Sequence, residues 1–371
     1  MGVWLRGAWP IVGQCAVSSP AVESQEPTRR HSAQPLRILG GKVAVAITLT
    51  MVTGLSTSCP SRKVAAPEAS GARVYLVTVT PLKLILDPLV GDRASVTVLL
   101  APGASAHTYE PRPSDAMRAE SCTAMFWVGE NFDGWAAMLQ APQKVALLEL
   151  LPAAERLPGV EHHHGEAEQG EAAHAGASAG GAEEQGTEGG KTVSLHEADP
   201  HVFTDPLTVR ALLPGLTAEL ARLDPDGAEQ YKANAAKFEQ ELDSLGGEVA
   251  KELAGVKGRS ALTYHQSFGY LFHRYGIVVA GVIEEFPGKE PSPRGLAHLV
   301  DAAREQHVAA LFTETLMPRR PAEVIAEATH LPLFELDPAC GASTRSYATY
   351  RDYVLYNAGV IAKALNQPDR P

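Results

Sequence analysis

The chain has 371 residues, which is enough for two or three ordinary domains and a sizeable buried core. It carries 32 basic and 43 acidic residues, so its formal net charge is -11 at pH 7. This balance argues against a nucleic-acid binder, which needs a basic surface to displace the counterions of the phosphates. The net negative charge favours a cation as the ligand of this protein.

The four cysteines are widely spaced, and none belongs to a Cys-x-x-Cys pair. This spacing argues against a structural zinc knuckle, a thioredoxin-like site or a disulfide scaffold. Two of them, Cys122 and Cys340, fall in segments that we assign below to different lobes, which argues against a bridge between them.

Near the start of the chain, an apolar segment at residues 43–55 follows Arg37 and Lys42. It is too short to span a bilayer comfortably, and a basic flank before a short apolar run is typical of a signal peptide. We therefore expect export. The sequence LSTSC, which ends at Cys59, is similar to a bacterial lipoprotein cleavage site, although Ser56 stands where leucine is usual. Lipidation of Cys59, plain cleavage nearby and an unmodified thiol all stay open.

Short apolar runs then alternate with stretches of helix or loop length. Buried strands separated by crossover helices are typical of parallel sheets, so this rhythm predicts two α/β lobes, each with a parallel sheet flanked by helices. The predicted strands are residues 74–79, 95–100, 124–128 and 144–148 in the first lobe and 260–264, 277–283, 308–312 and 332–336 in the second, where helical patterns lie at 268–275, 293–306 and 321–330.

Between the lobes, apolar residues recur every three or four positions over residues 226–254. This period predicts one long amphipathic helix that joins the lobes. Asp224 and Pro225 are expected to cap its start. Gly246 and Gly247 could introduce a kink, since each glycine costs about 1 kcal/mol relative to alanine.

These patterns divide the chain into five parts. We expect an N-terminal extension with the signal-like segment at residues 1–59, a tether at 60–72, the first lobe at 73–205, a connecting helical region at 206–257 and the second lobe at 258–371.

Inside the first lobe, residues 161–190 are rich in glycine, glutamate and histidine and contain neither lysine nor arginine. So few apolar groups cannot offset the entropy of ordering the chain, and we expect a disordered loop. Imidazole is a borderline ligand for late first-row metals, so weak auxiliary metal binding is expected at His162, His163, His164 and His174.

Four other loops place a metal-capable side chain at the edge of a predicted strand, where α/β folds put their sites. These are His107 in PGASAHTYEP, His201 in DPHVFTDP, His265 in TYHQSFGY and Asp337 in ELDP. Three imidazoles and one carboxylate suit Zn²⁺. Each residue alone also has an ordinary alternative, as a hydrogen-bonding loop histidine or, for Asp337, as a helix N-cap, and their spacing does not decide.

In chain order, PGASAHTYEPRPSD, DPHVFTDP, YHQSFGYLFHRYGI with PGKEPSP, and LFTETLMP with ELDP resemble the signature segments of solute-binding proteins of zinc and manganese ABC importers. The resemblance covers residues 73–365. It implies a two-lobed receptor with a long connecting helix, one transition-metal ion at the lobe interface, and delivery of that ion to a membrane permease. It further implies His107, His201 and His265 as nitrogen ligands and Asp337 as the carboxylate ligand.

The resemblance favours zinc as the metal, and a manganese or iron receptor of the same family is the alternative. Manganese-type members tend to carry a carboxylate where His265 stands, and a nitrogen-rich ligand set favours zinc. Ala106 stands where some zinc receptors carry an acidic residue, which puts more weight on Asp337. Glu314 could accept a hydrogen bond from a ligand imidazole, or it could be a carboxylate of the pocket wall.

The leading interpretation is a monomeric zinc receptor without catalytic turnover that serves an ABC permease and has no nucleic-acid partner. We expect it in the periplasm or on the outer face of the cytoplasmic membrane, anchored there if Cys59 is lipidated. One alternative is a surface lipoprotein with the same fold that acts as an adhesin or zinc scavenger. Another is a zinc hydrolase with Asp337 or Glu314 as general base, against which the absence of an HExxH motif counts.

Overall fold

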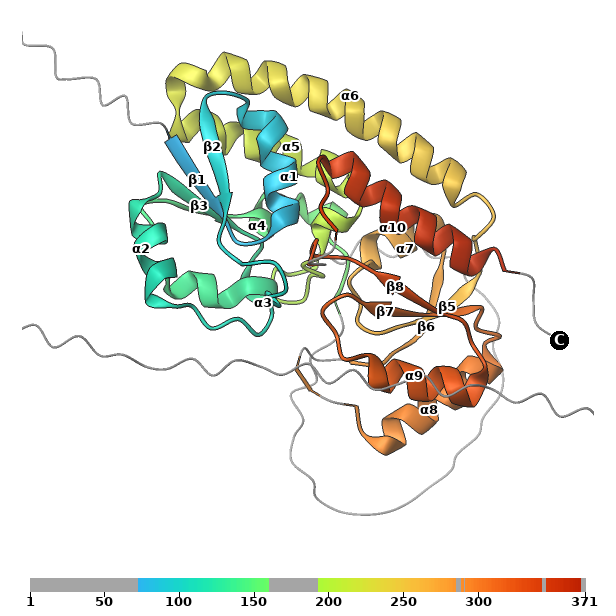
Figure 1. Ribbon diagram of the computed structural model, residues 1–371. Coiled ribbons are helices and arrows are strands. Elements are labelled where there is room, and N and C mark those ends of the chain that lie inside the picture. Colours follow the sequence, from blue (N-terminus) through green and yellow to red (C-terminus); the bar gives the residue numbers. More distant parts are fainter. Residues whose placement is uncertain (1–72, 160–192, 285–287, 290, 342–344, 368–371) are drawn as a thin grey trace, which may run out of the picture. The chain divides into compact units, whose positions relative to one another are not determined.

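The computed structural model describes residues 73–159, 193–284, 288–289, 291–341 and 345–367 (Figure 1). These residues belong to one compact unit, Glu68–Pro371. The signal-like segment, Cys59, the tether and the histidine-rich loop with His162, His163, His164 and His174 lie outside the described residues.

The first lobe is built on a parallel four-stranded sheet with the strand order β2-β1-β3-β4. Tyr75 of β1 pairs with Val96 on one side and with Ala124 on the other, so β1 is a central strand. Strand β3 has the sequence AMFW and is buried along its whole length, as expected of a strand covered on both faces. The elements of this lobe are β1 Arg73–Val77, α1 Thr80–Val90, β2 Ala94–Val98, α2 Pro113–Ser121, β3 Ala124–Trp127, α3 Glu130–Asp133, η1 Gly134–Met138, β4 Lys144–Ala146, α4 Leu147–Leu150 and η2 Ala153–Glu155.

The second lobe repeats this topology, with the parallel strand order β6-β5-β7-β8. Helices α8 and α9 pack against each other, α8 against β6 and α9 against β7 (Figure 1). Helix α8 begins where the Ser292 side chain accepts a hydrogen bond from the Gly295 amide. The elements are β5 Ser260–Thr263, α7 Gly269–Tyr275, β6 Val278–Val282, α8 Pro293–Glu305, β7 Ala310–Glu314, α9 Arg319–Thr329 and β8 Leu333–Leu336.

Helix α6, Ala228–Glu252, connects the two lobes. It packs against α1 of the first lobe, α5 of the connecting region and α10 of the C-terminal end, so one helix contacts both halves of the molecule (Figure 1). The neighbouring elements are η3 Val202–Thr204, α5 Pro206–Leu223, η4 Pro225–Gly227 and α10 Tyr350–Leu365.

The structure confirms the predicted fold class of two α/β lobes with parallel sheets and a long connecting helix. Helix α6 continues through Gly246 and Gly247. A Cβ atom at Gly246 would lie 2.9 Å from Leu207 of α5, so this glycine permits close packing of the two helices.

The predicted cap at Asp224 and Pro225 falls on η4 and not on α6. Asp224 stands at the N-cap of η4, but its side chain makes no capping hydrogen bond, and Gly227, the last residue of η4, is the N-cap of α6. The buried Asp224 carboxylate instead pairs with Arg73 at 2.8 Å and with Arg93 at 2.7 Å, and it accepts a hydrogen bond from the Tyr231 hydroxyl. It therefore ties the turn before α6 to the first sheet.

None of the helices in the described part of the chain combines the length and apolar content that a membrane crossing requires. Cys122 and Cys340 are both buried and both free thiols.

Candidate metal centre

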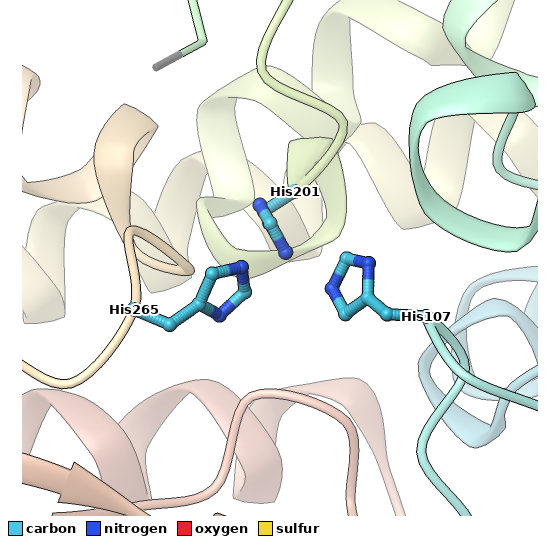
Figure 2. Close-up of side chains that lie close together, drawn as sticks. All are labelled: His107, His201 and His265. Carbon is cyan, nitrogen blue, oxygen red and sulfur yellow. The ribbon is translucent and has the colours of Figure 1, made fainter. Parts of the chain in front are cut away.

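His107, His201 and His265 converge on one point. Each offers a ring nitrogen, and the three nitrogens all lie within 4.8 Å of one another. Figure 2 shows one nitrogen of each ring turned toward the other two rings. The ring centroid of His265 is 4.6 Å from that of His201 and 5.0 Å from that of His107. Three imidazole nitrogens this close form a ready ligand set for a single metal ion.

Three separate segments supply these rings. His107 lies in the loop that follows β2, His265 follows β5 before α7 begins, and His201 immediately precedes η3. Strands β2 and β5 belong to different sheets, so each lobe contributes to the site a loop that follows one of its strands, which is where α/β folds place their sites. The indole of Trp135 donates a hydrogen bond of 2.6 Å to the Ala106 carbonyl and so holds the loop next to His107.

The ring of His201 is oriented by Asp199. The Asp199 Oδ1 atom lies 2.8 Å from the His201 Nδ1 atom and also accepts a hydrogen bond of 2.9 Å from the His201 amide. The Nε2 atom of His201 is buried and has no hydrogen-bond partner among the described residues. A buried nitrogen without a partner is costly unless a ligand occupies it, which fits a metal ion at this position.

His265 has its own carboxylate neighbour. The Glu314 Oε2 atom, at the end of β7, lies 3.5 Å from the His265 Nδ1 atom, and the Glu314 Oε1 atom accepts a hydrogen bond of 2.7 Å from the Ser267 hydroxyl. Both Glu314 and His265 are buried. Contact at Nδ1 leaves the Nε2 atom of His265 for the shared centre.

Burial and neighbouring charges set the protonation of the three rings. Burial and the nearby rings of His265 and His201 hold the pKa of His107 well below its ordinary value. Burial also lowers the pKa of His201, against the opposing effect of Asp199. For His265, burial acts to lower the pKa, but the Glu314 carboxylate raises it overall. His107 and His201 therefore favour the neutral form that binds metals, and His265 is the ring that holds a proton most readily.

The three rings line one cavity of about 30 Å³. That volume is enough for one or two water molecules or a single metal ion. The surrounding walls are mostly apolar, which strengthens electrostatic interactions inside. They include Phe132, Phe203, Leu316, Met317 and Pro338.

Phe132 supports two of the rings. Its centroid lies 4.7 Å from that of His107 and 5.4 Å from that of His201, with edge-to-face geometry in both contacts. The adjacent Asp133 carboxylate is buried and accepts hydrogen bonds from the Gly129 amide and the Thr78 hydroxyl, so the α3 turn that carries Phe132 is fixed to the ends of β1 and β3. Burial raises the pKa of Asp133 to about 6.

Asp337, the carboxylate that the family resemblance implies as a ligand, is not brought into this group of histidines. It is buried, and its Oδ1 atom accepts hydrogen bonds from the Thr315 hydroxyl at 2.9 Å and the Gly341 amide at 2.8 Å. Its Oδ2 atom accepts one from the Tyr347 hydroxyl at 3.0 Å and lies 3.8 Å from Arg345. No helix begins at Asp337, so its carboxylate closes the turn to Gly341 and does not cap a helix.

Two residues of the site were given no role from the sequence. Asp199 lies two positions before His201, and this close spacing of a carboxylate and an imidazole was the available signal. Phe132 carried no such signal, because it reaches the histidines only through the fold.

Comparison with known proteins identifies the family. The sequence profile of ZnuA, described as zinc-uptake complex component A, periplasmic, matches residues 76–364. The zinc-binding lipoprotein AdcA of Streptococcus pneumoniae is 26% identical over 260 residues, which are 69% of this chain and 47% of AdcA. The high-affinity zinc uptake system protein ZnuA of Paracoccus denitrificans is 28% identical over 288 residues, which are 76% of this chain and 88% of that protein. The chain spans about half the length of the streptococcal AdcA proteins it matches.

A solved structure agrees with these relatives. The crystal structure of a ZnuA deletion mutant (138-173) with zinc bound is similar to the structure of this chain, with a TM-score of 0.61 and 26% sequence identity. The match covers 80% of this chain and 100% of that chain. Because the family profile extends from β1 to α10, the chain belongs to the ZnuA family of periplasmic zinc-uptake components.

Proposed function

We propose that this protein binds one zinc ion outside the cytoplasmic membrane and delivers it to the permease of an ABC importer. The observation that carries the proposal is the convergence of ring nitrogens from His107, His201 and His265 within 4.8 Å. The zinc ion is the cargo, and the three imidazoles are its proposed ligands. Family membership supports the delivery step, since the matched family is that of a zinc-uptake component.

The ligand set favours zinc over manganese. Zinc accepts imidazole nitrogens in tetrahedral geometry, whereas manganese prefers carboxylate and water oxygens. Both carboxylates nearest the rings, Asp199 and Glu314, face Nδ1 atoms and act on the metal through the histidines. Asp337 lies outside this group of rings, and its carboxylate accepts hydrogen bonds from Thr315, Gly341 and Tyr347.

The position outside the membrane is supported by the periplasmic description of the family. A lipid anchor at Cys59 is part of this proposal, and the relative AdcA of Streptococcus pneumoniae is itself named a lipoprotein. Mass spectrometry of the membrane-associated protein tests the anchor. A diacylglycerol adduct on Cys59 is expected, and a mature N-terminus at another residue would contradict it.

Metal titration tests the central proposal. The full chain, stripped with a chelator, should bind one zinc tightly in competition with a chromophoric zinc chelator, and manganese should bind far more weakly. His201→Ala should lose the tight equivalent, because a tetrahedral zinc loses one of its nitrogen ligands. His298→Ala, on the exposed side of α8, is the matched control and should keep it. Absence of a tight equivalent in the unmodified protein would overturn the proposal.

A further inference from the structure

We infer that Asp199 is a positioning residue that sets the ring of His201 for metal binding, and that helix α7 of the second lobe holds Asp199 in this setting. The inference rests on the proposed function of the histidine site and adds residues that do not touch the metal. It links the second lobe to a ligand that the first lobe supplies.

The first step concerns the tautomer of His201. Asp199 is 2% exposed and His201 is 4% exposed, so water does not compete for their contact. A carboxylate can only accept hydrogen bonds, so the His201 Nδ1 atom, 2.8 Å from the Asp199 Oδ1 atom, must carry the proton. The neutral ring then presents the lone pair of its Nε2 atom, which is the atom that faces the other two histidines.

The second step concerns the backbone of Asp199. The Tyr270 hydroxyl, in the first turn of α7, donates a hydrogen bond of 3.0 Å to the Asp199 carbonyl and lies 3.4 Å from the Leu157 amide, which donates to it. The Asp199 amide in turn donates a hydrogen bond of 2.8 Å to the Leu157 carbonyl. The Tyr270 side chain thus contacts both segments of the isolated β-bridge between Pro158 and Ala198, which lies next to Asp199.

The third step concerns the Asp199 side chain. A Cβ atom at Gly269, the first residue of α7, would lie 2.2 Å from the Asp199 Oδ2 atom. Glycine is therefore required here if the carboxylate is to keep its place. The Oδ2 atom is buried and has no hydrogen-bond partner among the described residues. Close packing against α7 and the bonds to His201 are thus what hold the carboxylate in this orientation.

Nuclear magnetic resonance of the histidine rings tests the inference. In the metal-free, full chain labelled with ¹⁵N-histidine, the His201 resonances are assigned from their loss in His201→Ala. The unmodified protein should show His201 protonated at Nδ1. Asp199→Ala should shift the population toward the Nε2-protonated tautomer and weaken zinc binding about 10- to 100-fold. Asp199→Asn, which keeps an oxygen acceptor, should fall between the two.

A second set of variants tests the role of α7 without touching the carboxylate. Tyr270→Phe should shift the His201 tautomer and the zinc affinity in the same direction as Asp199→Ala, by a smaller factor. The matched control is Tyr350→Phe. It also removes a hydrogen bond from a buried tyrosine, because the Tyr350 hydroxyl donates to the Phe203 carbonyl, 2.9 Å away and two residues after His201. It should leave the tautomer unchanged.

Three results would overturn the inference: an unchanged His201 tautomer in Asp199→Ala, an unchanged tautomer in Tyr270→Phe, or an equal shift in Tyr270→Phe and Tyr350→Phe. The tautomer is measured without metal, so these results are separate from the proposed function. That function fails only if the unmodified protein has no tight zinc equivalent.

Discussion

The role of Asp337 gives the sharpest prediction, because the family resemblance and the geometry point to different roles. The resemblance implies a metal ligand, whereas in the structure its carboxylate accepts hydrogen bonds from Thr315, Gly341 and Tyr347. Its backbone is also fixed, since the Asn357 side chain of α10 accepts from the Asp337 amide and donates to its carbonyl. We expect Asp337 to stabilise the fold and to contribute little to zinc affinity.

The magnitude follows from these contacts. Asp337 is 0% exposed, so its replacement by alanine leaves buried donors at Gly341 and Tyr347 without an acceptor. A hydrogen bond to a charged group contributes about 1.5–3 kcal/mol, and removing one partner of a buried charge pair costs about 3–5 kcal/mol. Arg345 lies only 3.8 Å from the Asp337 carboxylate and would also lose a nearby negative charge. Asp337→Ala should therefore lower the free energy of unfolding of the metal-free protein by about 3–5 kcal/mol.

Two measurements separate the roles. Urea denaturation of the metal-free protein should show the loss of stability for Asp337→Ala, with an unchanged dependence on urea concentration. Zinc titration of the milder Asp337→Asn variant should show less than about a tenfold loss of affinity, far below the loss expected when a ligand is removed. A loss of a hundredfold or more, with stability intact, would refute the reasoning and assign Asp337 to the metal.

Three further predictions concern pH, the lobe contacts and the histidine-rich segment. Zinc affinity should fall as pH drops, because protons compete with zinc for the His265 ring. Burial lowers the pKa of His265, but Glu314 raises it overall, so the loss of affinity should begin at a higher pH than for a histidine with an ordinary pKa. Glu314→Gln should move this onset to lower pH in titrations at several pH values, and an unmoved onset would contradict the assignment. Asp205→Ala should lower the free energy of unfolding by about 3 kcal/mol in urea, because the buried Asp205 carboxylate caps α5 and pairs with Arg274 at 2.8 Å; a change below 1 kcal/mol would count against this. Deletion of residues 161–190 should remove weak zinc equivalents and keep the tight one, as equilibrium dialysis would show, and loss of the tight one would contradict a purely auxiliary role.

Much of the fold could be predicted from the sequence, because buried parallel strands leave a strong local pattern. The run AMFW of β3 and the run ALFTE of β7 are buried throughout, and helices separate them from their neighbours. The role of Asp224 could not be predicted in this way. Its position before Pro225 is a local capping signal, but its partners Arg73 and Arg93 come from a distant part of the chain.

The site shows the same division between local and distant information. The segments around His107, His201 and His265 could be selected from the sequence through their resemblance to a family, and the structure brings those three rings together. The environment of Asp337 could not be predicted, because it depends on how β8, the loop before α10 and the end of β7 meet. Sequence patterns identify candidate ligands, and the fold decides which of them reach one another.

Charge balance indicates what the carboxylates behind the rings would contribute to a zinc ion bound by the three histidines. A doubly charged ion in a small apolar cavity needs compensating negative charge nearby, because desolvation of an isolated ion is very costly. Asp199 contacts His201 at 2.8 Å and Glu314 contacts His265 at 3.5 Å, so one carboxylate stands behind each of two rings. Each carboxylate makes the ring in front of it a better donor to the metal. Two such carboxylates would balance the charge of one Zn²⁺ bound by the three imidazole nitrogens. A manganese ion, which prefers oxygen ligands, would bind these nitrogens poorly.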